Sequence, residues 1–186
     1  MNKSELRKIM IEKRRCMPKI EWENKSRLVQ QKLLLCDKFA AAKSIMLYVD
    51  CNNEVETRTI ISKCIDGGKQ VFVPVVRENH TMLAARVTSA DFENDYSKNR
   101  YGIFEPKTII PQPPSDIELI IAPMVAADKN MRRLGYGGGY YDRFLENTDA
   151  YITGLCFDFQ IVDFLPHDSH DKTMNQIITD KQIISG

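Results

Sequence analysis

Hydrophobic and polar residues follow two different periods along this chain. Near the N-terminus, apolar side chains return every three or four residues, as they do on one face of an amphipathic helix. Leu6 and Met10 belong to this pattern and predict a first helix that begins at a Ser4 N-cap and ends before Pro18. The same period continues and predicts a second helix over residues 21–37.

After residue 43 the pattern changes to short apolar runs that alternate with helical segments. The apolar runs predict strands over residues 44–49, 71–76, 80–87, 119–125, 151–157 and 176–179. The helical period predicts helices over residues 55–66, 140–147 and 159–164. Because strands alternate with helices, we expect an α/β fold with a mostly parallel sheet and helices on both faces, in a single domain over residues 1–186.

Some positions interrupt this regular order. Pro74 predicts that its strand lies at a sheet edge or carries a bulge, because proline has no N–H for the ladder. The strand over 80–87 is predicted to close a hairpin with it over residues 77–79. Residues 91–114 are rich in proline and predict an irregular surface excursion. Parallel sheets bind ligands beyond the carboxyl ends of their strands, so the segments after Val49 and Val125 are the first places to look for a site.

Composition and charge exclude several classes of protein. The chain has 26 Lys and Arg against 25 Asp and Glu, and a formal charge of +1 does not indicate a nucleic-acid binder. We find no apolar run of about 18 residues, so we expect no membrane span. The five cysteines are odd in number and show no CxxC spacing, which argues against a disulfide framework or a zinc site. With a charged rather than signal-like N-terminus, a cytoplasmic location is expected.

A glycine-rich segment after Val125 carries the clearest chemistry. Its glycines let the backbone approach a ligand closely, and they precede a predicted helix whose free N–H groups favour an anion. Arg132 and Arg133 add guanidinium groups that suit phosphate, and Asp142 is placed to hold a divalent cation. The segment contains neither a Walker loop nor a dinucleotide fingerprint. A bare structural turn is the simpler alternative, but the residues favour a nucleotide-phosphate site with Mg²⁺.

The same segment resembles the signature of the 5-formyltetrahydrofolate cyclo-ligase family. The residues that carry this resemblance are Arg133-Leu134-Gly135-Tyr136-Gly137-Gly138-Gly139-Tyr140-Tyr141-Asp142-Arg143. Shorter matches support it along nearly the whole chain, at Lys3-Ser4-Glu5-Leu6-Arg7, Glu54-Val55-Glu56-Thr57, Tyr101-Gly102-Ile103-Phe104-Glu105-Pro106, 157–160 and 165–179. Each short match is weak alone, but their order and spacing together are specific.

The resemblance implies a fold and a reaction. The fold would be a Rossmann-like three-layer sandwich, similar to the sugar-phosphate isomerase and coenzyme A transferase group. The reaction would be ATP-dependent conversion of 5-formyltetrahydrofolate to 5,10-methenyltetrahydrofolate, with ATP and Mg²⁺ as cofactors and small molecules as partners. The formyl oxygen would attack the γ-phosphate, and N10 would then close the ring and release phosphate. A monomer would suffice for this chemistry.

The resemblance also implies roles for particular residues. It implies ATP contacts through Lys3, Ser4, Glu5, Leu6, Arg7, Arg133, Leu134, Gly135, Tyr136, Gly137, Gly138, Gly139, Tyr140 and Tyr141. It implies folate contacts through Val49, Glu54, Tyr136, Gly137, Gly138, Gly139 and Tyr140. Arg133 and Tyr141 would be the catalytic groups, and Asp142 and Asp171 would bind Mg²⁺. For Lys8, Lys13, Arg14 and Arg15, a solvated helix face is the preferred interpretation.

Three positions depart from the family pattern. Met131 stands where a glycine is usual, so the local turn is expected to differ. Gly138 stands where lysine is common, which would leave Arg132 or Arg133 to neutralise more phosphate charge. Asn175 stands where an aspartate is common, which weakens any ligand role there.

Two alternative functions stay open. One is a sugar-phosphate isomerase-like or transferase-like enzyme on the same fold, which would need no ATP. The other is a non-catalytic folate- or nucleotide-binding protein that has kept the pocket.

Overall fold

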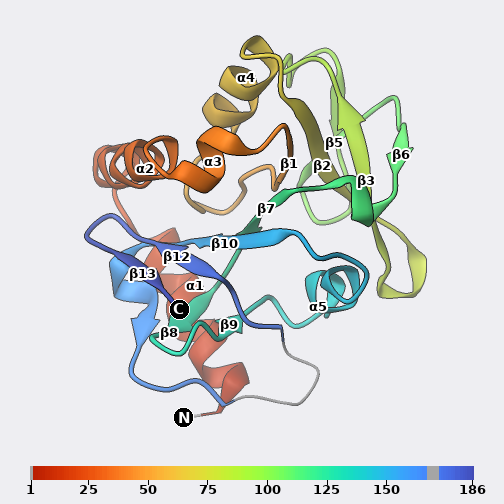
Figure 1. Cartoon of the computed structure of the whole chain (residues 1–186). Helices are drawn as coiled ribbons and strands as arrows, with labels where there is room; N and C mark the ends of the chain where they lie inside the picture. The colour runs from red at the N-terminus through yellow and green to blue at the C-terminus, as the bar shows by residue number, and fades with distance from the viewer. Residues whose placement is uncertain (1, 167–171) are drawn as a thin grey trace.

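The computed structural model describes residues 2–166 and 172–186 and is built around an eight-stranded sheet (Figure 1). Its strand order is β13-β12-β10-β7-β1-β2-β3-β6. The five inner strands run parallel: β12 (Gln176–Ile178), β10 (Tyr151–Leu155), β7 (Leu119–Pro123), β1 (Ser44–Leu47) and β2 (Gln70–Val76). The outer strands are antiparallel to their neighbours: β13 (Ile183–Ser185), β3 (Met82–Val87) and β6 (Pro111–Gln112). The mostly parallel sheet predicted from the sequence is therefore confirmed.

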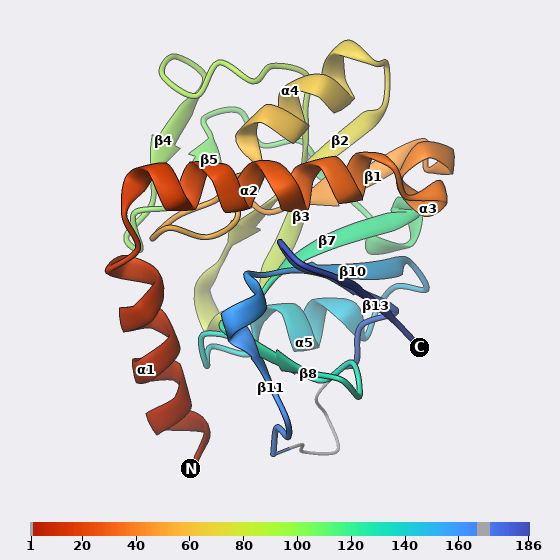
Figure 2. The same ribbon diagram turned by 90° about the vertical axis from the view of Figure 1, so that its left-hand side faces the viewer.

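Layers of other elements cover both faces of this sheet. Helices α2 (Lys19–Leu34), α3 (Asp37–Ala41) and α4 (Arg58–Asp66) lie on one face, and the short α5 (Tyr140–Leu145) lies on the other (Figures 1 and 2). Alternate side chains of β1 point to opposite faces of the sheet and so pack against different layers, because a strand is pleated. Ile45 and Leu47 pack with the residues of α2–α4, whereas Met46 packs with Phe144 and Leu145 of α5. This arrangement confirms a three-layer α/β sandwich.

A small second sheet connects the N-terminal helix to the glycine-rich segment. Its order is β11 (Ile161–Val162), β8 (Ala126–Asp128), β9 (Arg133–Leu134). Helix α1 (Lys3–Arg15) precedes α2 in the chain and lies beside this sheet (Figure 2). Leu6 and Met10 of α1 are buried in one cluster with Ala126 and Leu134. The apolar face of α1 thus holds the helix next to the start of the glycine-rich segment.

The proline-rich excursion has more structure than its sequence predicts. β4 (Tyr96–Lys98) and β5 (Phe104–Pro106) form an antiparallel pair, and β6 joins the main sheet. The Glu105 carboxylate accepts a hydrogen bond from the N–H of Val76 at 2.8 Å and another from the Asn99 amide at 2.9 Å. These bonds bring the excursion to the end of β2, where a ligand-binding edge of the sheet is expected.

Several predicted boundaries are wrong for local reasons. Asn2 caps α1 in place of Ser4, because its side chain accepts from the Glu5 N–H at 2.9 Å while Glu5 accepts from the Asn2 N–H at 3.1 Å. The second helix ends at Leu34 and is followed by α3. The helix predicted over 159–164 is a 3₁₀ turn (Asp158–Gln160) that leads into β11, and β13 was not predicted.

Pro74 lies in an interior strand, not at an edge. β2 pairs with β1 on one side and with β3 on the other. The pairing with β1 ends at Met46↔Phe72, so beyond that point one side of β2 needs no N–H donor. The hairpin between β2 and β3 is as predicted and turns through a 3₁₀ turn (Glu78–His80).

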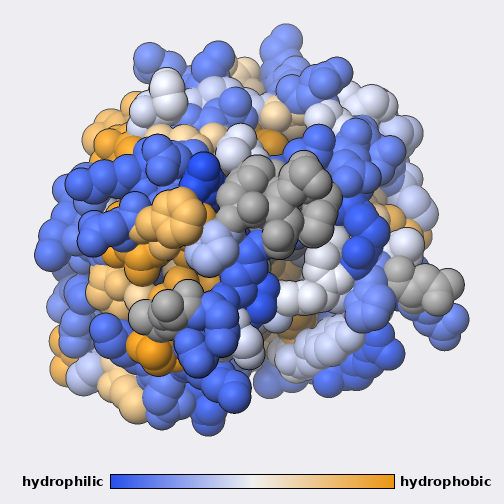
Figure 3. Space-filling view, turned by 90° about the horizontal axis from the view of Figure 1, so that it is seen from below, coloured by the Kyte–Doolittle hydropathy of each residue, from blue (hydrophilic) through white to orange (hydrophobic). Residues whose placement is uncertain are grey.

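The surface is mixed in character. Seen from below, it is largely hydrophilic, with hydrophobic residues gathered toward the left of the view (Figure 3). In the part of the chain that the structure describes, no helix is both long and apolar enough to cross a membrane.

Candidate functional site

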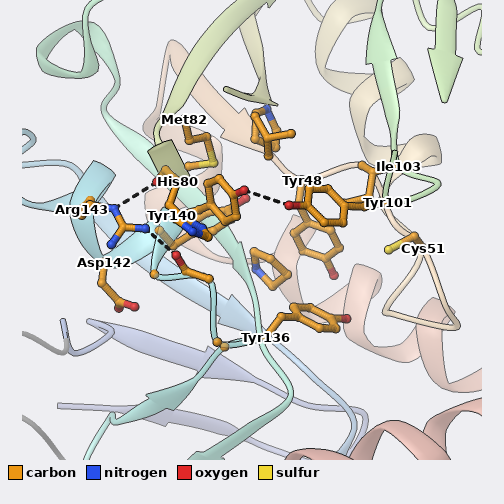
Figure 4. A pocket seen from close by; sticks show the side chains of 18 of the residues that line it. Tyr48, Cys51, His80, Met82, Tyr101, Ile103, Tyr136, Tyr140, Asp142 and Arg143 are labelled. Atoms are coloured by element: carbon orange, nitrogen blue, oxygen red, sulfur yellow. Dashed lines mark hydrogen bonds between the residues drawn. The ribbon is translucent and has the colours of Figure 1, made fainter. Parts of the chain in front are cut away.

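A cavity of about 830 Å³ opens beyond the carboxyl ends of β1 and β7, where the parallel sheet predicts ligand binding (Figure 4). It is lined by α1, the loop after β1, the β2–β3 hairpin, the excursion over 91–114, the end of β7 and the glycine-rich segment that leads into α5. The lining residues that the sequence predicted are Lys3, Arg7, Val49, Glu54, Arg133, Leu134, Gly135, Tyr136, Gly137, Gly138, Gly139, Tyr140, Tyr141 and Asp142.

The glycine-rich segment owes its course to left-handed backbone at two glycines. Gly137 has a φ of +101° and Gly139 a φ of +66°, values that residues with a Cβ rarely adopt. Arg7 secures the segment from α1, because its Nε donates to the Gly135 carbonyl at 2.8 Å. The Arg7 guanidinium also lies 3.5 Å from the position that a Cβ at Gly137 would occupy. Backbone and cation are therefore held close together in this part of the cavity lining.

The buried Arg133 forms an ion pair with the partly buried Asp142 at the base of the segment. Arg133 Nη2 lies 2.7 Å from Asp142 Oδ1, and the Arg133 side chain is only 3% exposed. Its guanidinium lies over the Tyr141 ring, 5.5 Å from the ring centre. Among the described residues, Arg133 Nε and the Tyr141 hydroxyl are buried without a hydrogen-bond partner. Burial raises the pKa of Tyr141 well above its usual value, so the hydroxyl stays protonated and can donate.

A second buried group of the cavity lining surrounds Glu54. The Tyr136 hydroxyl donates to Glu54 Oε1 at 2.5 Å, and the Cys51 N–H donates to Oε2 at 3.0 Å. Arg14 Nη2 donates to the Tyr136 oxygen. Burial raises the pKa of Glu54, while Arg14 and the hydrogen bond from Tyr136 lower it. Burial also raises the pKa of the Cys51 thiol to about 12, so this cysteine is no nucleophile.

Aromatic side chains span the middle of the cavity. Tyr101 and Tyr140 point toward each other, with their hydroxyl oxygens 3.1 Å apart (Figure 4). The ring of His80 lies 5.6 Å from the ring of Tyr140. Arg143 Nε donates to the His80 carbonyl at 3.0 Å, and its Nη2 donates to the Gly138 carbonyl. These contacts join the excursion, the β2–β3 hairpin and the glycine-rich segment around one space.

Comparison with known proteins shows which family has this sequence and fold. The sequence profile of the 5-formyltetrahydrofolate cyclo-ligase family matches residues 1–180. The chain belongs to the 5-formyltetrahydrofolate cyclo-ligase family. It is similar to the family enzyme of Escherichia coli K12, with 30% identity over 76% of this chain and 80% of the relative. The Haemophilus influenzae enzyme is 33% identical over 74% of this chain and 75% of its own length.

Solved structures agree with the family assignment. The solution structure of Aquifex aeolicus 5,10-methenyltetrahydrofolate synthetase has a TM-score of 0.87 and 30% identity, and covers 100% of this chain and 93% of that one. The Mycoplasma pneumoniae 5,10-methenyltetrahydrofolate synthetase has a TM-score of 0.78 and 26% identity, covering 97% and 99% of the two chains. The family resemblance and the three-layer α/β fold expected from the sequence are thereby confirmed.

Some residues that the family pattern suggested lie away from the cavity. In the described chain, Ser4 and Glu5 are exposed outside its lining, where Glu5 serves the helix cap, and Leu6 is buried in the core. Their part in ATP binding stays a prediction. Arg132 does not take up the phosphate-facing position expected of it, because its guanidinium lies over Phe164, 5.4 Å from the ring centre. Asp171 lies outside the described residues.

The two departures from the cyclo-ligase pattern near the cavity have clear structural consequences. Met131 has a φ of +62°, in the left-handed region that favours glycine. Its N–H donates to the Asp128 carbonyl at 3.2 Å, which closes the loop between β8 and β9. A Cβ at Gly138 would lie 2.7 Å from the Tyr140 ring, so the family lysine would displace Tyr140 as it stands here.

Sequence reasoning missed other residues of the site. Arg14 was assigned to a solvated helix face but is 1% exposed. Its spacing of seven residues from Arg7, on the same side of the helix, was the available signal. The excursion supplies Asn99, Tyr101, Ile103 and Glu105 to the lining, and the hairpin supplies His80 and Met82. The match over residues 101–106 indicated the family, but no local pattern predicted that these side chains line the cavity, because the tertiary fold brings them there from a distance.

Proposed function

We propose that this chain uses ATP and Mg²⁺ to convert 5-formyltetrahydrofolate to 5,10-methenyltetrahydrofolate. The observation that carries the proposal is a single cavity with two unlike sets of lining groups. One set is the glycine-rich backbone with the guanidinium groups of Arg7 and Arg133, and the other is the buried Glu54 carboxylate with its hydrogen-bond partner Tyr136. A volume of about 830 Å³ is near the top of the usual range for ligand sites, as two substrates that must meet would require.

The cationic set suits the phosphates of ATP. Lys3 and Arg7 line the cavity from one face of α1, and Arg133 and Arg143 line it from the glycine-rich side. Guanidinium groups bind phosphate oxygens through paired N–H donors. The left-handed backbone at Gly137 keeps side chains out of the way, so phosphate groups can approach the main chain there.

The other set suits the ring of a reduced folate. Glu54 lines the cavity with both oxygens already oriented by one hydrogen bond each, and each oxygen keeps acceptor capacity. A carboxylate can accept two parallel N–H bonds from a pterin ring. Val49, Tyr136 and Tyr140 add the apolar and aromatic surface that would hold the ring in place.

The reaction needs positioning and charge stabilisation more than a side-chain nucleophile. In the first step the formyl oxygen bonds to the γ-phosphorus and ADP leaves. In the second, N10 bonds to the formyl carbon, the C–O bond breaks, and the phosphate that leaves takes up the proton that N10 gives up. Arg133 Nε and the Tyr141 hydroxyl, which are buried without a protein partner in the described chain, would stabilise the negative charge that develops on the transferred group.

Asp142 is the residue that would hold Mg²⁺. Its Oδ1 pairs with Arg133, and Mg²⁺ in phosphoryl-transfer sites takes only one or two carboxylates besides phosphate oxygens and water. Residues 2–166 and 172–186 contain no group of three or more His, Cys, Asp or Glu that could hold a metal ion by themselves. The donor set fits an ion held mainly by bound nucleotide, which would neutralise phosphate charge. A contribution from Asp171 stays part of the proposal.

The decisive experiment mixes the purified protein with 5-formyltetrahydrofolate, ATP and Mg²⁺ and follows the near-ultraviolet absorbance of the methenyl product. Product that depends on both ATP and Mg²⁺ is the expected result. Binding of both ligands without product would favour a non-catalytic binding protein. Turnover of a sugar phosphate without ATP would favour the isomerase-like alternative.

We also propose that the protein works as a monomer in the cytoplasm. The cavity is complete within one chain, and all five cysteines are free thiols, as a reducing compartment allows. Light scattering during turnover would test the oligomeric state.

A further inference from the structure

We infer that Arg14 and Tyr136 form a positioning relay that keeps the Glu54 carboxylate charged and fixed in orientation for its ligand. Arg14 lies behind the cavity wall, outside the lining residues of the described chain, so it acts on a ligand only through other groups. The inference rests on the proposed function, because it concerns the folate-binding groups of the same site.

Arg14 is a buried arginine, and each of its three guanidinium nitrogens donates to one protein acceptor. Its Nε donates to the Asn52 carbonyl at 2.9 Å, and its Nη1 approaches the Met124 carbonyl at 3.4 Å. Its Nη2 donates to the Tyr136 hydroxyl oxygen, and the guanidinium lies 5.6 Å from the centre of the Tyr136 ring. One side chain thus connects α1 to the loop after β1, the end of β7 and the glycine-rich segment.

Tyr136 passes this interaction to the carboxylate. Its oxygen accepts from the Arg14 cation while its O–H donates to Glu54 Oε1 at 2.5 Å. A phenol polarised by a neighbouring cation is a stronger donor, so the two bonds reinforce each other. Burial, followed by the neighbouring Glu54 charge, raises the pKa of Tyr136, so its proton stays in the relay.

A buried carboxylate needs such a relay to stay ionised. Glu54 is 5% exposed, and desolvation favours its neutral form. The charged or titratable groups that interact with it are Arg14, Tyr136, Cys51, Tyr48 and Tyr141, and Asp50 acts on Tyr48 and Cys51 beside it. Arg14 is the positive charge that acts most strongly on Glu54, whereas the charge of Asp50 is balanced locally by Arg58, 3.1 Å away. Without Arg14, protonation of Glu54 would remove the acceptor that a pterin ring requires.

A ligand-free measurement tests the relay directly. The Glu54 carboxyl carbon is followed by ¹³C NMR during a pH titration and assigned by its loss in Glu54→Gln. In Arg14→Gln we expect its midpoint to rise by about 1–3 pH units, because an opposite charge has been removed. Arg14→Lys keeps the positive charge, so its Glu54 midpoint should stay close to the wild-type value. Arg15→Gln is the matched control on the same helix, since Arg15 is exposed and pairs with Glu12, and should leave the midpoint unchanged.

Steady-state kinetics provide a second readout. At neutral pH, Arg14→Gln should raise the KM for 5-formyltetrahydrofolate about tenfold or more while the KM for ATP stays near its wild-type value. Glu54 must be ionised to accept at both oxygens, so folate affinity falls as pH drops through its pKa. The higher pKa in Arg14→Gln moves that loss to higher pH. If Arg14 had a merely structural role, Arg14→Gln would raise the KM for both substrates together and would leave the pH dependence of folate affinity unchanged.

Tyr136→Phe covers the case in which Arg14→Gln does not fold. It keeps every charge and removes only the bridging hydroxyl, so the Glu54 midpoint should rise by a smaller amount. An unchanged midpoint in Tyr136→Phe and in every folded Arg14 variant would overturn the relay, even if the wild type makes product. A shifted midpoint in a protein that makes no product would overturn the proposed function and leave the relay standing.

Discussion

Met131 provides a sharp test of how this chain builds the turn before its glycine-rich segment. The residue has a φ of +62° yet is 7% exposed, so it combines an unfavourable backbone with a buried side chain. Two substitutions separate these effects. Met131→Gly removes both the strain and the side chain, whereas Met131→Ala removes the side chain and keeps the strain.

The expected magnitudes follow from packing and backbone preference. Truncating a buried methionine to alanine costs about 2–5 kcal/mol of unfolding free energy. At a positive φ, glycine is more stable than alanine by about 1 kcal/mol, because alanine must bear the strained conformation. We therefore expect Met131→Gly to be less stable than the wild type by about 1–4 kcal/mol but more stable than Met131→Ala. Packing outweighs strain, which explains how a methionine is tolerated at this position.

Urea unfolding followed by circular dichroism measures the three free energies. Met174 is the control, because it is buried in the same cluster and its φ is not positive. At Met174 the order should reverse, with alanine more stable than glycine by about 0.5–1 kcal/mol. The reasoning is refuted if Met131→Ala equals or exceeds Met131→Gly in stability, or if Met131→Gly is more stable than the wild type.

Three further predictions concern activity. Gly138→Lys and Gly138→Ala should both raise the KM for 5-formyltetrahydrofolate several-fold. The reason is that a Cβ at this position would lie 2.7 Å from the Tyr140 ring and would displace it. An unchanged KM in the alanine variant would contradict this. Asp142→Asn should raise the Mg²⁺ concentration needed for half-maximal turnover about tenfold or more, with folate binding by calorimetry as the control that should not change. Arg133→Ala should raise the KM for ATP by about tenfold or more, and by less for folate, whereas equal effects in initial-rate measurements would assign Arg133 to shaping the loop.

Local periodicity was sufficient for the main elements of the fold. The strand now seen as Ser44–Leu47 and the helix Arg58–Asp66 were predicted within a few residues, because short apolar runs and a helical repeat report burial directly. The boundary errors have local causes that the periodicity does not carry. The cap at Asn2 and the break at Leu34 depend on hydrogen bonds and packing at a helix end.

The candidate site was predictable where its residues are neighbours in sequence. The glycine-rich segment from Gly135 to Gly139 is recognisable from its composition. The spacing of Lys3 and Arg7 places them on one helix face. Asn99 and Tyr101 gave no such signal, because they reach the cavity through the bond from Val76 to Glu105 and not through any property of their own segment.

The sequence by itself therefore determined the fold class, the family and the position of the phosphate-directed loop. Tertiary structure alone decided the charge environment of Glu54. Arg14 and Tyr136 are 122 positions apart, and Tyr136 and Glu54 are 82 apart. Whether such groups meet depends on how α1, the sheet and the glycine-rich segment pack together. The same arginine is a solvated cation on an isolated helix and a buried donor in the folded protein, because burial belongs to the assembled layers and not to the local sequence.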